Sequence, residues 1–385
     1  MYPLYQLLFA DHGLSATQIS TLFIIWSTTA FVLEVPSGAW ADTFSRRRLL
    51  VLAALLTGAG YAAWVVFPSY AGFAAGFILW GAGSALASGT FEAFAYDELA
   101  ARGATERYAG LIGRATSASF VLNLAATALA APLFAAGGYL LVGWISVLVC
   151  VAQAAVALSL PEASPVATAD ETLPSEAGVV GRYLAMLRSG LTEVATTRVV
   201  RNAVILVAVV SGFLAFDEYF PLLARDMGAS TTVVPLLIAG TVAAQAIGSA
   251  LAGPAYRLRS GPIALGLAAA AGLIAFGSLS GTTAGFVPIA AGYGVMQLVI
   301  VVADARLQDA ITGPARATVT SVSGLFSEVF AVAIYAGFAL GGIWFGLPVL
   351  VAALTVPVLV TAFLLPRWLP HRALAVSPDS SEASS

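Results

Sequence analysis

The feature that most constrains this chain is a series of long apolar runs separated by short polar turns. Eleven such runs, each of about 20 residues, are long enough to cross roughly 30 Å of hydrocarbon as helix. A shorter apolar stretch opens the chain at residues 1–10. Strands of a membrane barrel would be about 10 residues long and polar on one face, and no segment has that pattern. The sequence therefore predicts an all-helical integral membrane protein, with spans at 18–41, 49–67, 70–91, 108–134, 139–160, 202–224, 232–256, 261–280, 284–303, 317–338 and 347–365.

Composition agrees with this class and excludes several functions. The 385 residues are 59% hydrophobic and 10% charged, against roughly 25% charged in soluble domains. All 17 basic residues are arginine, so a phosphate-binding loop that needs lysine is absent, and the chain is not an ATP-driven pump of that kind. Cys150 is the single cysteine, and the two histidines, His12 and His371, lie at a run's edge and in the tail. These residues cannot form a disulfide, a metal centre or a nucleophile-base pair, so we expect no cofactor and no enzymatic activity.

The distribution of arginine predicts the orientation in the membrane. Arg46, Arg47 and Arg48 form a tight basic turn between two apolar runs. Placing this turn in the cytoplasm puts 16 of the 17 arginines in or near cytoplasmic segments and leaves only Arg225 outside. We therefore expect a multi-pass protein of the cell (inner or plasma) membrane, with its arginine-rich loops and its C-terminus in the cytoplasm.

An internal repeat runs through most of the chain. The stretch Asp11-His-Gly13-Leu-Ser15 is echoed by Asp226-Met-Gly228-Ala-Ser230 at an offset of 215. Parallel repeats of this kind predict two six-helix halves. In the second copy about 15 further residues precede the position that matches Met1, so we expect the first helix to lack its N-terminal half. A short re-entrant opening helix is the alternative.

Composition also predicts the domain boundaries. We expect one six-helix bundle at 1–160 and another at 199–370. The interval 161–198 begins as a linker rich in proline, alanine and acidic residues, and then places apolar residues at helical spacing. That spacing predicts an amphipathic helix on the cytoplasmic surface. The tail at 371–385 is polar and small, and we expect it to be disordered.

The stretch Glu34-Val-Pro-Ser-Gly-Ala-Trp-Ala-Asp-Thr-Phe-Ser-Arg-Arg-Arg48 joins the runs 18–41 and 49–67, which are helices 2 and 3 when the opening stretch 1–10 is counted as helix 1. Through Gly38, Asp42, Arg46 and Arg47 it resembles the signature loop of the major facilitator superfamily. The resemblance implies two six-helix bundles related by a pseudo-twofold axis and secondary transport by alternating access. The ending of the fourth span, Ser88 to Asp97, further resembles a bacterial subgroup of drug-efflux type, which implies proton-coupled export (antiport) of a small amphipathic molecule.

Two departures from that subgroup keep other functions open. Proton-coupled drug antiporters carry an arginine in the fourth helix, and the stretch from Phe77 to Ser88 has none. Their Gly-Pro-x-x-Gly-Gly motif is reduced here to Ala131-Pro132 followed by Gly137-Gly138. A proton symporter or an uncoupled facilitator for uptake of a small metabolite is the nearest alternative, and a membrane-embedded protein without transport is a remote one.

Charged residues within apolar runs are costly, so each is a functional hypothesis. Glu328 lies about 12 residues into its run, near the bilayer midplane at roughly 18 Å. Glu34, Glu92 and Arg114 lie at matching depths nearer the cytoplasm, and they could form one charge network or simply latch a gate. Asp217 lies in the outer third of its run beside Glu218, which we interpret as a residue of a solvated cavity mouth. The proton-coupling candidates are Glu328, Glu92, Glu34 and Asp217, and the gate or motif candidates are Gly38, Asp42, Arg46, Arg47, Asp97 and Arg114.

The resemblance also implies that helices 1, 4, 7 and 10 line a central path. For each aromatic residue there, ordinary helix or lipid contact is the alternative. We expect a small-molecule substrate and protons as partners, the lipid bilayer as surroundings, no nucleic acid, and a monomer. The substrate-cavity candidates are Tyr5, Gln6, Ser84, Ser88, Phe213, Tyr293 and Gln297.

Overall fold

The computed structural model describes residues 1–161, 181, 188, 192, 194–311 and 316–370. Within these residues, ten helical segments are long and apolar enough to cross a membrane. The predicted runs 108–134 and 139–160 lie in one of these segments, α6, whose backbone breaks at Gly137 and Gly138. Gly138 has φ 60° and ψ −158°, a combination that essentially only glycine adopts. For the described residues, the all-helical membrane class is therefore confirmed.

The described residues fold into thirteen α-helices and three 3₁₀ helices, several of them short. The predicted amphipathic helix of the linker and the C-terminal tail lie largely outside the described residues. In chain order the elements are α1 (Tyr5–Asp11), α2 (Ala16–Thr43), α3 (Arg46–Val66), α4 (Tyr70–Ala87), α5 (Thr90–Ala100), η1 (Thr105–Arg107), α6 (Tyr108–Ser159), α8 (Arg198–Gly212), η2 (Phe213–Tyr219), α9 (Phe220–Asp226), α10 (Val234–Ala255), α11 (Ser260–Leu279), η3 (Thr283–Gly285), α12 (Phe286–Ala310), α13 (Arg316–Gly341) and α14 (Leu347–Trp368).

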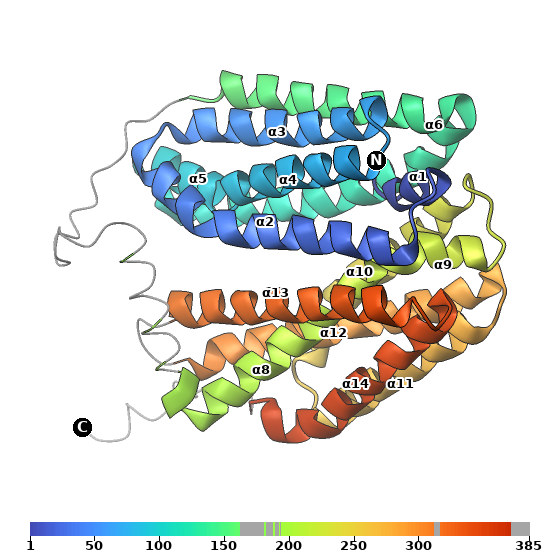
Figure 1. Ribbon diagram of the computed structural model, residues 1–385. Helices are drawn as coiled ribbons and strands as arrows, with labels where there is room; N and C mark the ends of the chain where they lie inside the picture. Colours follow the sequence, from blue (N-terminus) through green and yellow to red (C-terminus); the bar gives the residue numbers. More distant parts are fainter. Residues whose placement is uncertain (162–180, 182–187, 189–191, 193, 312–315, 371–385) are drawn as a thin grey trace, which may run out of the picture.

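The helices pack in two groups, which we call the N half (α1–α6) and the C half (α8–α14) (Figure 1). In the N half, α3 packs against α4 and α6, and α2 packs against α4. In the C half, α12 packs against α10 and α11, α11 against α14, and α13 against α8. Contacts between the halves join α2 to α13, α6 to α10, and α1 to α9. The boundaries expected at 160 and 199 stay a prediction.

The bundle has two distinct ends, and serines start helices at both. At the end we call the arginine-rich end, Ser45 caps α3 by accepting a hydrogen bond from the backbone nitrogen of Arg48 at 3.3 Å. At the opposite end, which we call the Asp11 end, Ser15 and Gln18 form a reciprocal capping box at the start of α2. Such caps satisfy backbone N–H groups that a helix start leaves unpaired. The polar turns are therefore suited to ending each span.

The repeat seen in the sequence reappears in the backbone. Gly13 and Gly228 have φ values of 84° and 88°, and each ends a seven-residue helix, α1 or α9. The packing repeats as well. A Cβ atom added to Gly81 of α4 would lie 3.1 Å from Cβ of Thr29 on α2, and one added to Gly294 of α12 would lie 2.6 Å from the carbonyl oxygen of Ala244 on α10. The offsets between these positions match the repeat, so both halves use a small residue at the same close helix contact.

Two predicted continuous spans are broken in the structure. The run 70–91 divides into α4 and α5 because Gly89 adopts a left-handed conformation with φ 67°, which places Glu92 in the first turn of α5. The run 202–224 divides into α8, the 3₁₀ helix η2 and α9. A 3₁₀ segment of seven residues is longer than the usual three or four, and such segments often mark functional hinges. Asp217 and Glu218 both lie in η2.

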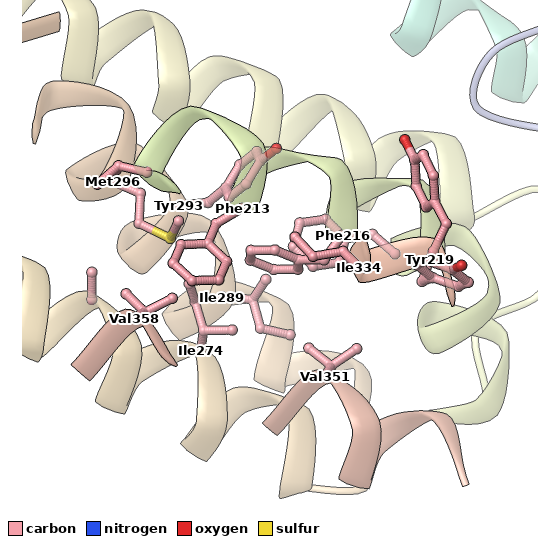
Figure 2. Close-up of a cluster of buried hydrophobic side chains, with 14 of the residues drawn as sticks. Phe213, Phe216, Tyr219, Ile274, Ile289, Tyr293, Met296, Ile334, Val351 and Val358 are labelled. Carbon is pink, nitrogen blue, oxygen red and sulfur yellow. The ribbon is translucent and has the colours of Figure 1, made fainter. Parts of the chain in front are cut away.

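Aromatic side chains fill the core of each half. In the N half, Tyr5 of α1 packs against Trp64 and Phe77, with ring centroids 5.2 and 5.8 Å apart. The buried indole nitrogen of Trp64 donates a hydrogen bond to the carbonyl oxygen of Phe73 at 3.0 Å. In the C half, Phe213 and Tyr293 are buried in a cluster that includes Ile274 and Ile289 (Figure 2). This packing holds η2 and α1 against the boundary between the halves.

Candidate functional site

A buried polar contact joins the two halves through η2. The Glu218 carboxylate accepts hydrogen bonds from the Tyr5 hydroxyl and from Nε2 of Gln6, the latter at 2.8 Å. One residue along, the Tyr219 hydroxyl lies 2.7 Å from the Ser20 hydroxyl of α2. Tyr5, Gln6 and Ser20 are fully buried, and Glu218 is 9% exposed. Glu218 is therefore held by donors from the opposite half.

A second polar contact between the halves lies near the middle of the bundle. Ser27 of α2 donates a hydrogen bond to Oε2 of Glu328 on α13 at 2.6 Å. Glu328 lies 13 residues before the end of α13 at Gly341, about 20 Å along the helix. Ser27 is buried, whereas Glu328 is exposed. The deepest predicted acid is therefore accessible and lies on the boundary between the halves.

The Asp11 end carries an ion pair across the same boundary. Nη1 of Arg225 on α9 lies 2.6 Å from Oδ1 of Asp11, and its Nη2 lies 3.3 Å from Oδ2. The Tyr139 hydroxyl donates to the same carboxylate at 2.6 Å. Nearby, the Thr17 hydroxyl donates to the carbonyl oxygen of Ala339 at 2.8 Å. Together these contacts tie the two halves at this end.

The arginine-rich end differs. Arg46 forms an ion pair with Asp97 of α5, and Arg47 donates to the carbonyl oxygen of Leu160 at 3.2 Å, so both of these contacts stay within the N half. Eight hydrogen bonds between described residues of the two halves lie between the Ser27–Glu328 contact and the Asp11 end. In this conformation the halves are therefore joined from mid-bundle to the Asp11 end.

The predicted charge network of Glu34, Glu92 and Arg114 does not form in this conformation. Glu34 accepts a hydrogen bond from the Ser88 hydroxyl at 2.9 Å. Nε of Arg114 donates to the carbonyl oxygen of Gly110 in its own helix at 3.2 Å. Glu92 is exposed and contacts neither residue, because the break at Gly89 separates α5 from α4. Gly38 and Asp42 lie in α2, but their side-chain surroundings lie outside the described part of the chain.

The predicted cavity residues divide into two groups. Tyr5 and Gln6 lie at the boundary between the halves, and Ser88 lies beside Glu34. Phe213 and Tyr293 instead lie within the packed C-half core (Figure 2). There the Tyr293 hydroxyl donates to the carbonyl oxygen of Leu214 at 3.1 Å. This corrects the expectation that both face an open path here, because the turn of η2 directs Phe213 into the core. Ser84 and Gln297 are half-buried on α4 and α12.

Two residues with notable surroundings were missed by the sequence analysis. Glu218, which the sequence places at a solvated cavity mouth, is buried in the structure. The pair Ser211-Gly212 just before it is a signal for the break in the helix, because kinks occur at such Gly/Ser pairs. Arg306 of α12 is 3% exposed and donates to the carbonyl oxygens of Tyr256 and Leu258, at 2.9 and 2.5 Å. It thereby holds the turn between α10 and α11, much as the Arg46–Asp97 pair holds the turn between α2 and α3.

Comparison with known proteins agrees with this architecture. The sequence profile described as Major Facilitator Superfamily matches residues 1–334. No curated protein sequence matches the chain. Among solved structures, an inward-facing, unoccupied bacterial homolog of the human lysosomal transporter Spinster has a TM-score of 0.72 at 16% identity, covering 95% of this chain and 92% of that one.

Two further solved structures have a similar fold. The nucleoside transporter NupG has a TM-score of 0.68 at 12% identity, covering 95% of this chain and 93% of that one. A D-xylose–proton symporter has a TM-score of 0.65 at 14% identity, covering 95% and 92%. At these identities the likeness extends to the fold alone.

Proposed function

Since the chain belongs to the Major Facilitator Superfamily, we propose that it is a proton-coupled secondary transporter that exports a small amphipathic molecule by alternating access. The chain is a multi-pass membrane transporter and not an enzyme. The coupling, the direction and the kind of substrate are the parts that we propose. The proposal includes two functional halves, 1–160 and 199–370, joined by the segment 161–198, and a monomeric protein in the cell membrane.

The contact between Glu328 and Ser27 is the observation that carries the proposal. Glu328 is an acid near mid-depth, it is exposed, and its hydrogen-bond partner belongs to the other half. Rocking of the halves about this boundary would therefore change both the partner of the carboxyl group and the side from which water reaches it. A carboxyl group whose surroundings differ between two conformations binds a proton with different affinity in each, which is the requirement for coupling.

Orientation and direction follow from separate observations. An arginine-rich end in the cytoplasm satisfies the positive-inside rule, so the conformation described here would be closed toward the outside. Aromatic rings of Phe23 and Tyr335, with centroids 5.3 Å apart, pack at the boundary on the Asp11 side of Ser27 and Glu328. Both rings are buried here, and opening of the Asp11 end would expose them beside Glu328. An acid next to exposed aromatic rings suits a ligand with an apolar body and a polar group. Export is the direction implied by the resemblance of Ser88 to Asp97 to the efflux subgroup.

Proton movement in reconstituted vesicles tests the proposal. Everted vesicles carrying the protein are energised and then given ethidium as an amphipathic probe, and the internal pH is followed for wild type, Glu328→Gln and Glu92→Gln. We expect wild type to release protons from the vesicle when ethidium is added, and Glu328→Gln to lower this flux at least tenfold. Glu92→Gln should retain most of it, because Glu92 contacts neither the boundary nor Arg114 here.

The same assay separates the alternatives. Proton and probe moving in the same direction would indicate a symporter, and probe movement without proton flux would indicate an uncoupled facilitator. Equal proton flux in wild type and Glu328→Gln would remove Glu328 from the coupling step and refute the proposal in its present form.

A further inference from the structure

The contact around Glu218 holds two adjacent acidic side chains but no matching basic one. Asp217 and Glu218 are adjacent in η2, Asp217 is half-buried, and Glu218 is buried. Among the described residues, no arginine or histidine forms an ion pair with either carboxylate. The nearest basic residue along the chain, Arg225, is already paired with Asp11. Buried ionised carboxylates without an opposite charge are unfavourable even when they accept hydrogen bonds, so this arrangement calls for a positive charge from elsewhere.

Gln6 provides an independent observation at the same place. Its side chain is fully buried, and its Nε2 donates to Oε2 of Glu218 at 2.8 Å. An ionised carboxylate only accepts hydrogen bonds, so the amide must turn its nitrogen toward Glu218. The other amide atom, Oε1, is then left buried and has no hydrogen-bond partner. Since buried polar atoms are nearly always satisfied, an orphaned acceptor beside two carboxylates points to a missing donor or cation.

We propose that Glu218 and Oε1 of Gln6, with Asp217 adjacent in η2, form a binding site for one small monovalent cation, either a proton or a sodium ion. Every ligand atom is an oxygen, which is the donor type that hard cations prefer. A divalent ion is disfavoured because it requires six or more oxygens in a well-defined shell. The site deepens the proposed function, since it rests on that function for its role: it would hold a second coupling cation, in addition to the proton assigned to Glu328.

The location explains how occupancy would couple to conformation. Gln6 and Tyr5 belong to the N half, whereas Asp217 and Glu218 belong to the C half. The ligands are complete only while the halves touch at the Asp11 end. A cation bound there stabilises this closed conformation, and opening of the Asp11 end separates the ligands and releases the ion toward that side. Such differential affinity is what a ligand needs in order to shift a conformational equilibrium.

The other ionisable groups near Glu218 do not supply the charge. The ionisable groups that interact with Glu218 or Asp217 are phenol groups, which are neutral or negative and never positive. They belong to Tyr2, Tyr5, Tyr219, Tyr293 and Tyr335. Glu328 lies farther along α13 and adds a further acid. The elements in contact with η2 are α1, α2, α8, α9, α13 and α14. Their charged residues with described side chains are Asp11, Glu34, Arg198, Arg201, Arg225, Asp226, Glu328 and Arg367.

Thermal unfolding of the purified full chain tests the site without requiring transport. Wild type, Glu218→Gln, Gln6→Leu and the surface control Glu106→Gln are unfolded in NaCl, KCl and choline chloride at constant ionic strength and pH 8. A sodium site predicts a saturable, sodium-selective rise in the unfolding temperature for wild type and Glu106→Gln. In Glu218→Gln and Gln6→Leu, the sodium concentration that gives half of the maximal rise in unfolding temperature should increase at least tenfold.

The proton arm uses tryptophan fluorescence without sodium. Tyr5 packs against Trp64 and Trp80, with centroids 5.2 and 5.9 Å apart, so a change at Glu218 reaches these indoles. A proton site predicts a pH-dependent change in emission for wild type and Glu106→Gln that Glu218→Gln lacks. If Glu218→Gln matches wild type in both the salt series and the pH series, the site is refuted. Cation binding without probe transport would instead refute the proposed function while keeping the site.

Discussion

The ion pair at the Asp11 end should bias the protein toward the conformation described here. Arg225 and Asp11 are the oppositely charged side chains that pair across the boundary, with exposed fractions of 28% and 41%. Replacing Arg225 with glutamine removes the pair and keeps most of the side-chain length. We expect the halves to separate more often at this end, because a contact made in only one of two conformations stabilises that conformation.

The size of the effect follows from the geometry of the pair. Exposed ion pairs contribute about 0.2–1 kcal/mol, and solvent screening limits this pair in the same way. Two nitrogen–oxygen contacts and the Tyr139 hydroxyl on the same carboxylate favour the upper part of that range. A loss of about 1 kcal/mol changes the ratio of closed to open about fivefold, so an open population of about 5% would rise to about 20%.

Distance measurements between spin labels can detect such a change. Cys150 is the only cysteine, so its replacement by serine gives a background for labels at Pro68→Cys in the N half and Thr282→Cys in the C half. Both positions are exposed at the Asp11 end. We expect Arg225→Gln to increase the population at long distances.

High salt should reduce the difference between wild type and Arg225→Gln, because salt screens the pair in wild type. The matched control is Arg102→Gln, which breaks an arginine–carboxylate pair with Glu98 inside the N half at the other end. Identical distance distributions for wild type and Arg225→Gln at low salt would refute the reasoning, as would an equal shift in the control.

Three further predictions concern stability in detergent, followed by thermal unfolding. Gly294→Leu should lower stability by about 1–3 kcal/mol, because even a Cβ atom there would lie 2.6 Å from the Ala244 carbonyl oxygen. Gly138→Ala should lower it by about 1–3 kcal/mol, because alanine is strained at φ 60° and ψ −158°. Trp64→Phe should also cost about 1–3 kcal/mol, because the carbonyl oxygen of Phe73 loses its buried donor.

Matched controls distinguish these effects from a general sensitivity to substitution. Gly272 of α11 is exposed and has no heavy atom within 4 Å of an added Cβ, so Gly272→Leu and Gly272→Ala should change stability little. Trp344 is 71% exposed, and Trp344→Phe should be similarly mild. The packing and strain assigned here would be contradicted if Gly294→Leu or Gly138→Ala unfolded at the same temperature as the matching Gly272 variant. The role of the indole hydrogen bond would be contradicted if Trp64→Phe unfolded at the same temperature as Trp344→Phe.

The repeat shows how far local patterns extend into tertiary structure. The echo of Asp11 to Ser15 by Asp226 to Ser230 predicted two related halves, and the structure shows the same left-handed glycine in both copies. The equivalence of Gly81 and Gly294 went unnoticed in the sequence, because a glycine within an apolar helix does not reveal which neighbour approaches it. Only the packed helices distinguish a close contact from a lipid-facing position.

The acidic residues show where local patterns stop. Glu328 was predicted to be the deepest acid, and depth follows from counting residues along a helix of known rise. Its partner Ser27 lies 301 residues away, and Glu218 pairs with Tyr5 across 213 residues. No spacing along one helix encodes such pairs. The breaks at Gly89 and at η2 moved Glu92 away from the predicted network and turned Phe213 into the core, and both depend on packing between helices.

By itself the sequence determined that this chain crosses the membrane many times as helix, where the spans lie, which end is basic, and that the chain is built twice over. These properties are local, because hydrocarbon thickness sets the length of each run and backbone hydrogen bonding within the bilayer requires helix. The tertiary structure decided which helices break, which end of the bundle is closed, and that Glu218 rather than Glu92 meets the opposite half. Those outcomes depend on contacts between distant segments, whose energies arise only once the two halves are packed together.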